Sequence, residues 1–220
     1  MFYNTHCHFL QKHPHEISIY NLFGDETEIP QSFFSAGFHP WQMLPEDRIE
    51  YYQTCLVPKW QNEHCVAIGE IGLDKVKGID WQIQIYRFKA QLNMAKKFDK
   101  PVIIHSVKAY YEVLSILNQV KWDKPYIFHG FNKSYTLAKD LLQKGAMLSF
   151  GMALDDNRFI KQVFMPVWKE YPAQILLESD TNPIPIQVLY QKIADNLNVP
   201  LSVVCQVIQN TVEKTFGHLS

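Results

Sequence analysis

The chain lacks long runs of apolar residues. Its uninterrupted apolar stretches span a few residues, as in Pro101 to Ile104, whereas a membrane helix needs about 18 or more. The first residues, Met1 to His6, contain no basic segment followed by an apolar one, which a secretory signal would require. We therefore expect a cytoplasmic protein with no membrane span and no membrane partner.

Arginine and cysteine are also scarce. Only three arginines occur, and 21 Lys and Arg residues face 22 Asp and Glu residues, which gives a formal charge of -1. This balance excludes the broad basic surface of a protein that coats nucleic acid, so any contact with nucleic acid must be local. The four cysteines form no C-x-x-C pair, which argues against a zinc ribbon or a redox motif and favours buried free thiols.

The chain is rich in apolar runs of strand length. With 220 residues and 47% hydrophobic content it is large enough for a sizeable core, which excludes a disordered chain. The runs are apolar at consecutive positions, as in the strands of a parallel sheet that is covered on both faces. Eight such runs occur, at residues 2–6, 16–22, 32–37, 65–72, 101–105, 125–131, 146–150 and 173–178.

Amphipathic helical patterns separate several of these runs. Apolar residues recur with helical spacing over 85–95, 186–197 and 205–216, and Ser202 and Gly217 are placed to cap and to end the last helix. Strands that alternate with helices predict an α/β fold, a (β/α)8 TIM-type barrel. A doubly wound sheet is the alternative, but no G-x-G-x-x-G follows the first strand.

The length fits a compact barrel in a single domain over residues 1–220, near the low end of the ~200 to 400 residues typical of this fold. Three strand-helix units must fit between His6 and Glu70. Because no helical pattern lies between Phe9 and Pro30, we predict that the helix after the first strand is shortened or missing.

Side chains that bind metals fall at the carboxyl ends of the predicted strands, where barrel active sites are built. Residues two apart in a strand share a face, so a histidine pair in the first strand points inward and Cys7, between them, belongs to the core. Each residue alone has a structural explanation, such as a turn at Asp180, but their joint placement predicts a metal centre. The six candidate ligands are His6, His8, Glu70, His105, His129 and Asp180.

Four imidazoles and two carboxylates suit Zn2+, Mn2+ or Mg2+. A single catalytic zinc uses three protein ligands, so six ligands favour two ions. Glu70 would reach in from the side of the barrel rim opposite His6 and His8. It is therefore the natural bridge between the two ions.

Different short motifs are spread along nearly the whole chain, and G-E-I-G-L-D is the most specific of them. They are T-H-C-H at 5–8, S-A-G-F-H-P-W at 35–41, A-I-G-E-I-G-L-D at 67–74, P-V-I-I-H at 101–105, F-H-G-F at 128–131, L-S-F-G at 148–151 and L-L-E-S-D at 176–180. Together they resemble the TatD-type metal-dependent deoxyribonucleases of the amidohydrolase superfamily. The resemblance implies a (β/α)8 barrel with one or two divalent ions.

By the same resemblance, one ion would be held by His6, His8 and Asp180, the other by His105 and His129, with Glu70 as the bridge. The chain departs from the family pattern at two positions. Asn4 stands where the family usually has Asp, which removes a negative charge near the first ligands. Val107 stands where the family tends to have Arg, and Lys108 replaces that clamp only as a point charge. The chain resembles a compact branch of the family.

The predicted activity is divalent-metal-dependent hydrolysis of a phosphodiester such as DNA, with exonuclease-like action. The ions would lower the pKa of bound water towards ~7, and the resulting hydroxide would attack phosphorus. The two candidate catalytic residues are Asp180, as general base, and Glu70, as the bridge between the ions. Aromatic residues on the loops that follow the strands, Trp41 among them, could stack bases. Four candidates for substrate binding follow the third to sixth strands, namely His39, Lys75, Lys108 and Lys133.

Two alternatives stay open. The same metals could serve a hydrolase of a small amide, lactone or phosphoester, because the same hydroxide attacks carbon or phosphorus. From another class, the chain could be a non-catalytic metal-binding interaction module. The oligomeric state is open, and a monomer fits the sequence.

Overall fold

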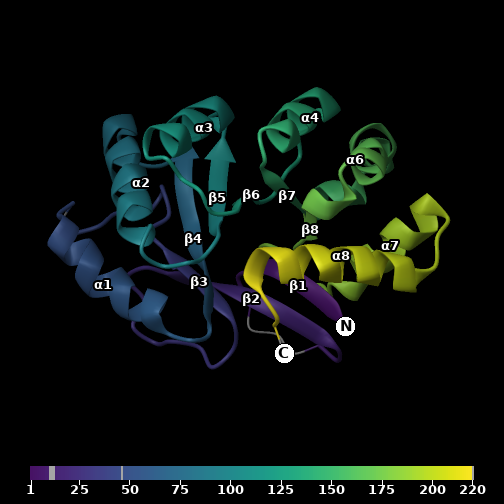
Figure 1. The fold of residues 1–220 in the computed structure, drawn as a ribbon, viewed down its shortest axis with the longest axis horizontal. Helices are drawn as coiled ribbons and strands as arrows, with labels where there is room; N and C mark the ends of the chain where they lie inside the picture. Colours follow the sequence, from purple (N-terminus) through teal and green to yellow (C-terminus); the bar gives the residue numbers. More distant parts are fainter. Residues whose placement is uncertain (10–12, 46, 220) are drawn as a thin grey trace. The chain divides into compact units, whose positions relative to one another are not determined.

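The computed structural model describes residues 1–9, 13–45 and 47–219. Eight strands form one sheet in chain order from β1 to β8, and every pair with a defined register is parallel (Figure 1). From β3 onward, helices separate successive strands. The fold is therefore of the (β/α)8 TIM type, as the sequence predicts.

All eight predicted strands are present, although some differ in length from the apolar runs. The strands are β1 (Phe2–Cys7), β2 (Glu16–Phe23), β3 (Phe34–Gly37), β4 (Cys65–Asp74), β5 (Val102–Val107), β6 (Tyr126–Phe128), β7 (Met147–Phe150) and β8 (Ile175–Leu177). The α-helices are α1 (Ile49–Gln61), α2 (Trp81–Ala95), α3 (Tyr110–Gln119), α4 (Tyr135–Gln143), α5 (Asn157–Phe159), α6 (Met165–Glu170), α7 (Gln187–Leu197) and α8 (Leu201–Phe216). Between β7 and β8 lie also η1 (Met152–Asp155), η2 (Ile160–Phe164, a π-helix) and η3 (Pro172–Gln174).

The front of the chain carries fewer helices than the rest. The described residues between β1 and β2, which are 8–9 and 13–15, form no helix, and this agrees with the predicted loss of the first helix. The connection from β2 to β3, residues 24–33, is also without a helix. Among the described residues, the first helix thus follows β3, and the short connections before it contribute to the small size of this barrel.

The chain divides into two compact units. The first unit comprises Met1–Tyr20 and Ile127–Ser220, and the second comprises Asn21–Tyr126. A single domain over residues 1–220 stays a prediction of the sequence.

In the first unit, helix α8 lies against β1 and β8. Its predicted apolar stripe is confirmed, because Ile208 and Val212 are fully buried. The predicted cap is wrong: the helix begins at Leu201 after Pro200, and no side chain caps it. Proline fixes the extended turn into the helix by its ring, so Ser202 falls inside the first turn.

In the second unit, α1 and α2 lie against β4, and the predicted stripe of α2 buries Phe88, Leu92 and Ala95. Two polar side chains of α2 hold the segment that follows β3. Gln91 accepts a hydrogen bond from the Phe38 N–H (2.7 Å) and donates one to the Phe38 carbonyl (3.1 Å). Further along, Arg87 donates to the Gln42 carbonyl at 2.6 Å. Residues 38–42, which include His39, are therefore fixed to this helix.

Strands β4 and β5 approach each other closely at Gly72. This residue has a φ of +150°, and a Cβ at its position would lie 2.0 Å from the carbonyl oxygen of His105. We expect Gly72→Ala to lower the free energy of unfolding by about 3 kcal/mol, because the backbone of a central strand cannot move aside. Urea unfolding followed by circular dichroism measures the loss.

Gly217 is the matched control for this substitution. It also has a positive φ, +79°, but no atom lies within 4 Å of a Cβ at its position. Gly217→Ala should therefore cost about 1 kcal/mol, the backbone term alone. Equal losses for the two variants would contradict the role assigned to the close approach.

The segment after β3 is also held by an ion pair between Asp47 and the buried Arg87, with Nε to Oδ1 at 2.5 Å. Burial raises the pKa of Asp47, but hydrogen bonds from Arg87 and Tyr52 outweigh it and hold the pKa below the ordinary 3.8. The pair thus stabilises the fold above pH ~4, and this contribution is lost as the pH falls through the lowered pKa.

We expect Asp47→Asn to lower the free energy of unfolding by about 2 kcal/mol at pH 7, because Arg87 loses its counter-charge. Below pH ~4 the difference between the variant and the wild type should shrink, since Asp47 of the unfolded wild type then takes up a proton, and Asp47 of the folded wild type does so only at lower pH. Urea unfolding between pH 3 and pH 8 checks this sign. A difference that grows with acidity would contradict it.

Candidate metal centre

In the first unit, predicted ligands gather at the carboxyl ends of β1, β6 and β8. One donor atom each of His6, His129 and Asp180 lie within 4.8 Å of one another. Oδ1 of Asp180 also lies 3.5 Å from Nε2 of His8 and 3.9 Å from Nε2 of His6. This unit therefore brings together four of the six predicted ligands.

Asp180 is placed by backbone pairing with β1. Its N–H donates to the His6 carbonyl (3.0 Å), and its own carbonyl accepts from the His8 N–H (2.9 Å). Its φ of +52° is left-handed, which an aspartate tolerates better than most residues. The two bonds on either side of Cys7 fix the carboxylate beside the histidine pair.

Cys7 lies between the two histidines, and it is buried as predicted. Its thiol donates to the Ile19 carbonyl. Burial raises the pKa of the thiol to about 12, so Cys7 stays protonated at neutral pH. Metals bind the thiolate, so Cys7 is a core residue and not a ligand.

Glu178 is a member of this group that the sequence interpretation missed. It is fully buried, accepts a hydrogen bond from the Gly130 N–H (2.7 Å), and its Oε1 lies 3.4 Å from Nδ1 of His129. Burial raises the pKa of Glu178, but the hydrogen bond and the charge of His129 outweigh it and hold the pKa below its usual value. A carboxylate of this kind orients a ligand histidine. Its position two residues before Asp180 was the available signal.

In the second unit, a group forms at β3, β4 and β5. Donor atoms of His39, Glu70 and His105 lie within 4.8 Å of one another, and all three residues are buried. Oε1 of Glu70 lies 2.7 Å from Nδ1 of His105 and 3.1 Å from Nε2 of His39. The backbone N–H of Glu70 donates to Oδ1 of Asn21 at 2.7 Å. His39, predicted only as a substrate contact, is thus a neighbour of the carboxylate.

A second carboxylate holds the other side of His105. Oδ2 of Asp74 lies 3.2 Å from Nε2 of His105 and accepts a hydrogen bond from the indole N–H of Trp41 at 2.8 Å. Its Oδ1 accepts from the backbone N–H groups of Val76 (2.7 Å) and Lys77 (2.9 Å). Burial raises the pKa of Asp74, but these donors outweigh it and hold the pKa below its usual value. Asp74 therefore stays ionised.

The sequence interpretation also missed Asp74. It lies four residues after Glu70 in β4, so the two carboxylates are on the same face of the strand. β4 and β5 each extend two residues beyond the predicted run, with Asp74 paired to Val107. That extension brings Asp74 level with the imidazole of His105.

Both donor groups suit a divalent ion. Nitrogen and oxygen ligands bind zinc at about 2.0 to 2.2 Å, so tetrahedral donors are roughly 3.4 Å apart. Donor atoms within 4.8 Å of one another reach this spacing by small side-chain rotations. The combination of imidazole and carboxylate is the set that Zn2+ and Mn2+ accept.

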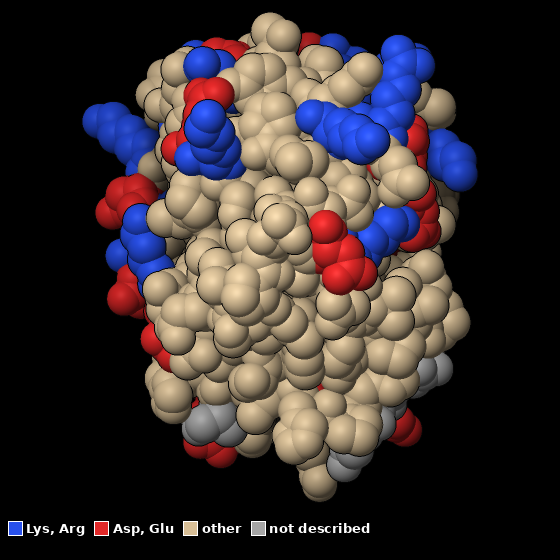
Figure 2. Space-filling view, turned by 90° about the vertical axis from the view of Figure 1, so that its right-hand side faces the viewer, with Lys and Arg blue, Asp and Glu red and all other residues tan. Residues whose placement is uncertain are grey.

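The three predicted lysines differ in their surroundings. Lys75 forms an ion pair with Glu112, and its ammonium lies 5.5 Å from the ring centroid of Trp81. Lys108 and Lys133 are exposed, directly after β5 and five residues after β6. On the face drawn in Figure 2, basic and acidic side chains are interspersed with wide uncharged surface. The face drawn there therefore carries no broad basic coat.

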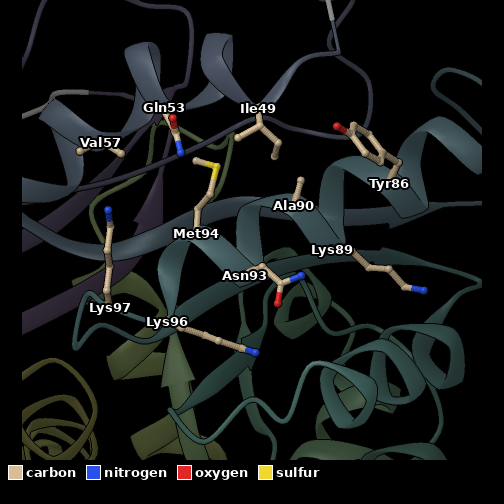
Figure 3. A pocket seen from close by; sticks show the side chains of 10 residues that line it. All are labelled: Ile49, Gln53, Val57, Tyr86, Lys89, Ala90, Asn93, Met94, Lys96 and Lys97. Atoms are coloured by element: carbon tan, nitrogen blue, oxygen red, sulfur yellow. The ribbon is translucent and has the colours of Figure 1, made fainter.

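A groove of about 560 Å³ lies elsewhere in the second unit, between α1 and α2 (Figure 3). Its lining contains no carboxylate and no imidazole, so it lacks the groups that hydrolysis needs. The lining residues are Ile49, Gln53, Val57, Tyr86, Lys89, Ala90, Asn93, Met94, Lys96 and Lys97.

A (β/α)8 fold with histidine and carboxylate groups at the carboxyl ends of its strands defines the class: barrel proteins with a candidate divalent-metal centre. The family follows from sequence comparison. The model of the TatD-related DNase family matches residues 18–217, and the chain belongs to this family.

Several relatives are similar in sequence. A protein of Haemophilus influenzae named an uncharacterized metal-dependent hydrolase is 27% identical over 158 residues, which are 70% of this chain and 60% of that protein. YjjV of Escherichia coli K12, with the same description, is 29% identical over 157 residues, 70% of this chain and 60% of its own length. The matched part of the chain thus spans about 60% of the length of these relatives.

The fold has close structural neighbours. The crystal structure of YjjV, a TatD homolog, has a TM-score of 0.79 at 22% identity and covers 99% of this chain and 98% of that one. A TatD family hydrolase of Entamoeba histolytica has a TM-score of 0.71 at 13% identity, with the same coverage. Both support the barrel fold.

Among the described residues, no helix is long and apolar enough to span a membrane.

The amide at Asn4 has a structural reason. Its Nδ2 donates to Oε1 of Glu16 (3.1 Å) and to Oγ of Ser179 (2.8 Å), while its Oδ1 accepts from the Ser179 N–H (3.0 Å). An aspartate here would face the carboxylate of Glu16. The negative charge expected at position 4 therefore lies on the neighbouring strand, at Glu16.

We expect Asn4→Asp to lower the free energy of unfolding by about 2 kcal/mol at pH 7, because two carboxylates would then be in contact. In Asn4→Asp with Glu16→Gln the donor and acceptor are exchanged, so most of the loss should be recovered. Urea unfolding of both single variants and the double variant forms a double-mutant cycle. Additive losses would contradict the relocation of the charge.

Proposed function

We propose that the chain is a divalent-metal-dependent hydrolase that cleaves phosphodiester bonds, with DNA as the substrate class and exonuclease-like action. The observation that carries the proposal is the pair of donor groups, His6–His129–Asp180 and His39–Glu70–His105, at strand ends of a TatD-related chain. The names of the relatives, which are metal-dependent hydrolases, support it.

In the first unit, His6, His8 and Asp180 would hold one ion. In the second unit, Glu70 and His105 would act as ligands of an ion. The bridge by Glu70 and the shared ion of His105 and His129 stay predictions of the sequence. When bound, divalent ions polarise a phosphoryl oxygen and lower the pKa of a water molecule.

Asp180 is the proposed general base. Its side chain is 31% exposed, whereas Glu70 is 3% exposed and Glu178 is fully buried, so Asp180 is the carboxylate that water reaches most easily. Its backbone is bonded to β1 on both sides of Cys7, which places its carboxylate beside the histidine pair, where it would accept the proton of an attacking water molecule. Glu178 and Asp74 hold the imidazoles of His129 and His105 in place.

A phosphodiester is favoured over a carboxylic ester or an amide by the family model, a DNase model, and by the lysines of the loops that follow the strands. The second candidate is a hydrolase of a small amide, lactone or phosphoester, because buried imidazole and carboxylate ligands serve these reactions equally well. A non-catalytic metal-binding module is the third.

We expect Glu70→Gln and Asp180→Asn each to lower the cleavage of labelled single-stranded DNA by a hundredfold or more, because each removes a charged ligand or base. The protein is first freed of metal with a chelator and then given Mg2+, Mn2+ or Zn2+. Bound metal is counted by elemental analysis. The exposed residues Glu63 and Asp123 supply matched controls, Glu63→Gln and Asp123→Asn, which should leave cleavage unchanged.

Equal cleavage by the wild type and both ligand variants would overturn the nuclease. Binding of metal with hydrolysis of a lactone or an amide, but not of DNA, would establish the second candidate instead. Full metal binding without turnover of any of these substrates would establish the binding module, and less than one bound equivalent would overturn the metal centre itself.

A further inference from the structure

Trp41 combines exposure with a fixed position. Its side chain is 45% exposed, although it lies beside the buried His39–Glu70–His105 group. The indole N–H donates to Asp74, and the ring contacts His39 (centroids 4.7 Å apart) and His105 (5.2 Å) edge to face. A large aromatic ring is therefore held rigidly at the edge of the proposed metal ligands.

The loop between β4 and α2 brings an ammonium group to this ring. Nζ of Lys77 lies 4.9 Å from the centroid of Trp41. The loop also packs closely on the tryptophan segment, since a Cβ at Gly78 would lie 2.7 Å from the Pro40 carbonyl and 3.3 Å from the Trp41 ring. Gly78 has a φ of +100°, so glycine is needed there.

Both ends of this loop are held by one buried side chain. Gln84 of α2 accepts from the Asp74 N–H (2.8 Å) and donates to the carbonyls of Asp74 (3.1 Å) and Ile79 (2.8 Å). The Lys77 N–H itself is bound to Asp74. The ring and the backbone that carries the lysine are thus set before any ligand arrives, which lowers the cost of ordering them on binding.

The charge of Lys77 is available to an anion. Among the described residues, no carboxylate forms an ion pair with Lys77, whereas Lys75 in the same loop is paired with Glu112. The chain therefore holds two lysine–tryptophan pairs in one loop region, Lys75 with Trp81 and Lys77 with Trp41. Only in the second pair is the tryptophan tied to the donor group, through Asp74.

We propose that Trp41 and Lys77 form a nucleotide subsite, in which a base stacks on the indole and its phosphate binds the ammonium of Lys77. The subsite rests on the proposed function, because it names the part of the substrate that lies beside the hydrolysed bond. Every base has a π-face, so stacking on tryptophan tolerates any sequence. A lysine grips phosphate as a point charge and does not demand one orientation.

The test is binding without turnover. A fluorescein-labelled oligothymidylate of about eight nucleotides and an equally long abasic oligomer, which has the same phosphates but no bases, are titrated with protein in chelator at low salt, and anisotropy gives the Kd. We expect the wild type to bind the base-bearing oligomer about tenfold more tightly than the abasic one.

The variants separate the two contacts. Trp41→Leu should abolish the preference for bases, whereas Trp41→Phe should keep most of it, because a ring remains although the hydrogen bond to Asp74 is lost. Lys77→Gln should weaken both oligomers alike and lower the slope of log Kd against log salt by about 0.7. The control Lys96→Gln should change neither, since the exposed Lys96 follows the last residue of α2, at the end of the helix away from this loop.

Competition distinguishes a free nucleotide from a strand. Thymidine monophosphate should displace the probe at lower concentration than thymidine or inorganic phosphate, because it carries both groups. The subsite is overturned if the wild type binds neither oligomer in chelator, binds both equally, or keeps its base preference in a folded Trp41→Leu protein. Circular dichroism checks folding, and Trp41→Phe supplies the second variant should Trp41→Leu unfold.

Hydrolysis is not measured in this experiment, so the two proposals fail separately. Base-selective binding without DNA cleavage would overturn the nuclease and leave a nucleotide-binding site. DNA cleavage without base selectivity would overturn the subsite alone.

Discussion

The imidazole of His105 lies between two carboxylates of a single strand, and the second unit is arranged around this contact. Glu70 and Asp74 lie on one face of β4, and the close approach of β5 at Gly72 brings the ring between them. Asp74 in turn accepts hydrogen bonds from the Trp41 indole and from the backbone of the loop that leads to α2. Each ring nitrogen faces one carboxylate, Nδ1 at 2.7 Å from Glu70 and Nε2 at 3.2 Å from Asp74, so the strand pairing fixes the orientation of the imidazole.

In the first unit, different residues hold an imidazole beside a carboxylate. There Glu178 lies against His129, and the backbone of Asp180 is bonded to β1 on both sides of Cys7. The charge that Asn4 lacks is supplied from Glu16 on the next strand. In both units a buried carboxylate orients an imidazole. Burial of the carboxylate costs free energy unless its imidazole partner is present. These carboxylates therefore belong to the candidate metal centre as much as the candidate ligands do.

The strands, and the placement of the candidate ligands at strand ends, could be predicted, because buried parallel strands are consecutively apolar in sequence and polar residues follow their ends. The absence of a helix between β2 and β3 was not predicted, because the sequence analysis assigned the missing helix to the connection after the first strand alone. Asp74 and Glu178 were missed because their roles depend on strand register. The ion pair of Lys75 with Glu112 joins residues 37 positions apart, so no local sequence pattern predicts it.

The bonds that Gln84 makes to the β4–α2 loop go to backbone atoms. Those bonds are indifferent to the side chains that the loop displays at positions 75–77. Residues there can be exchanged without disturbing Glu70, Asp74 or His105, as long as Gly78 keeps its turn. The candidate ligands are thus held independently of the side chains of this loop, and the loop is the place where a protein engineer would begin to redirect this scaffold to a new substrate.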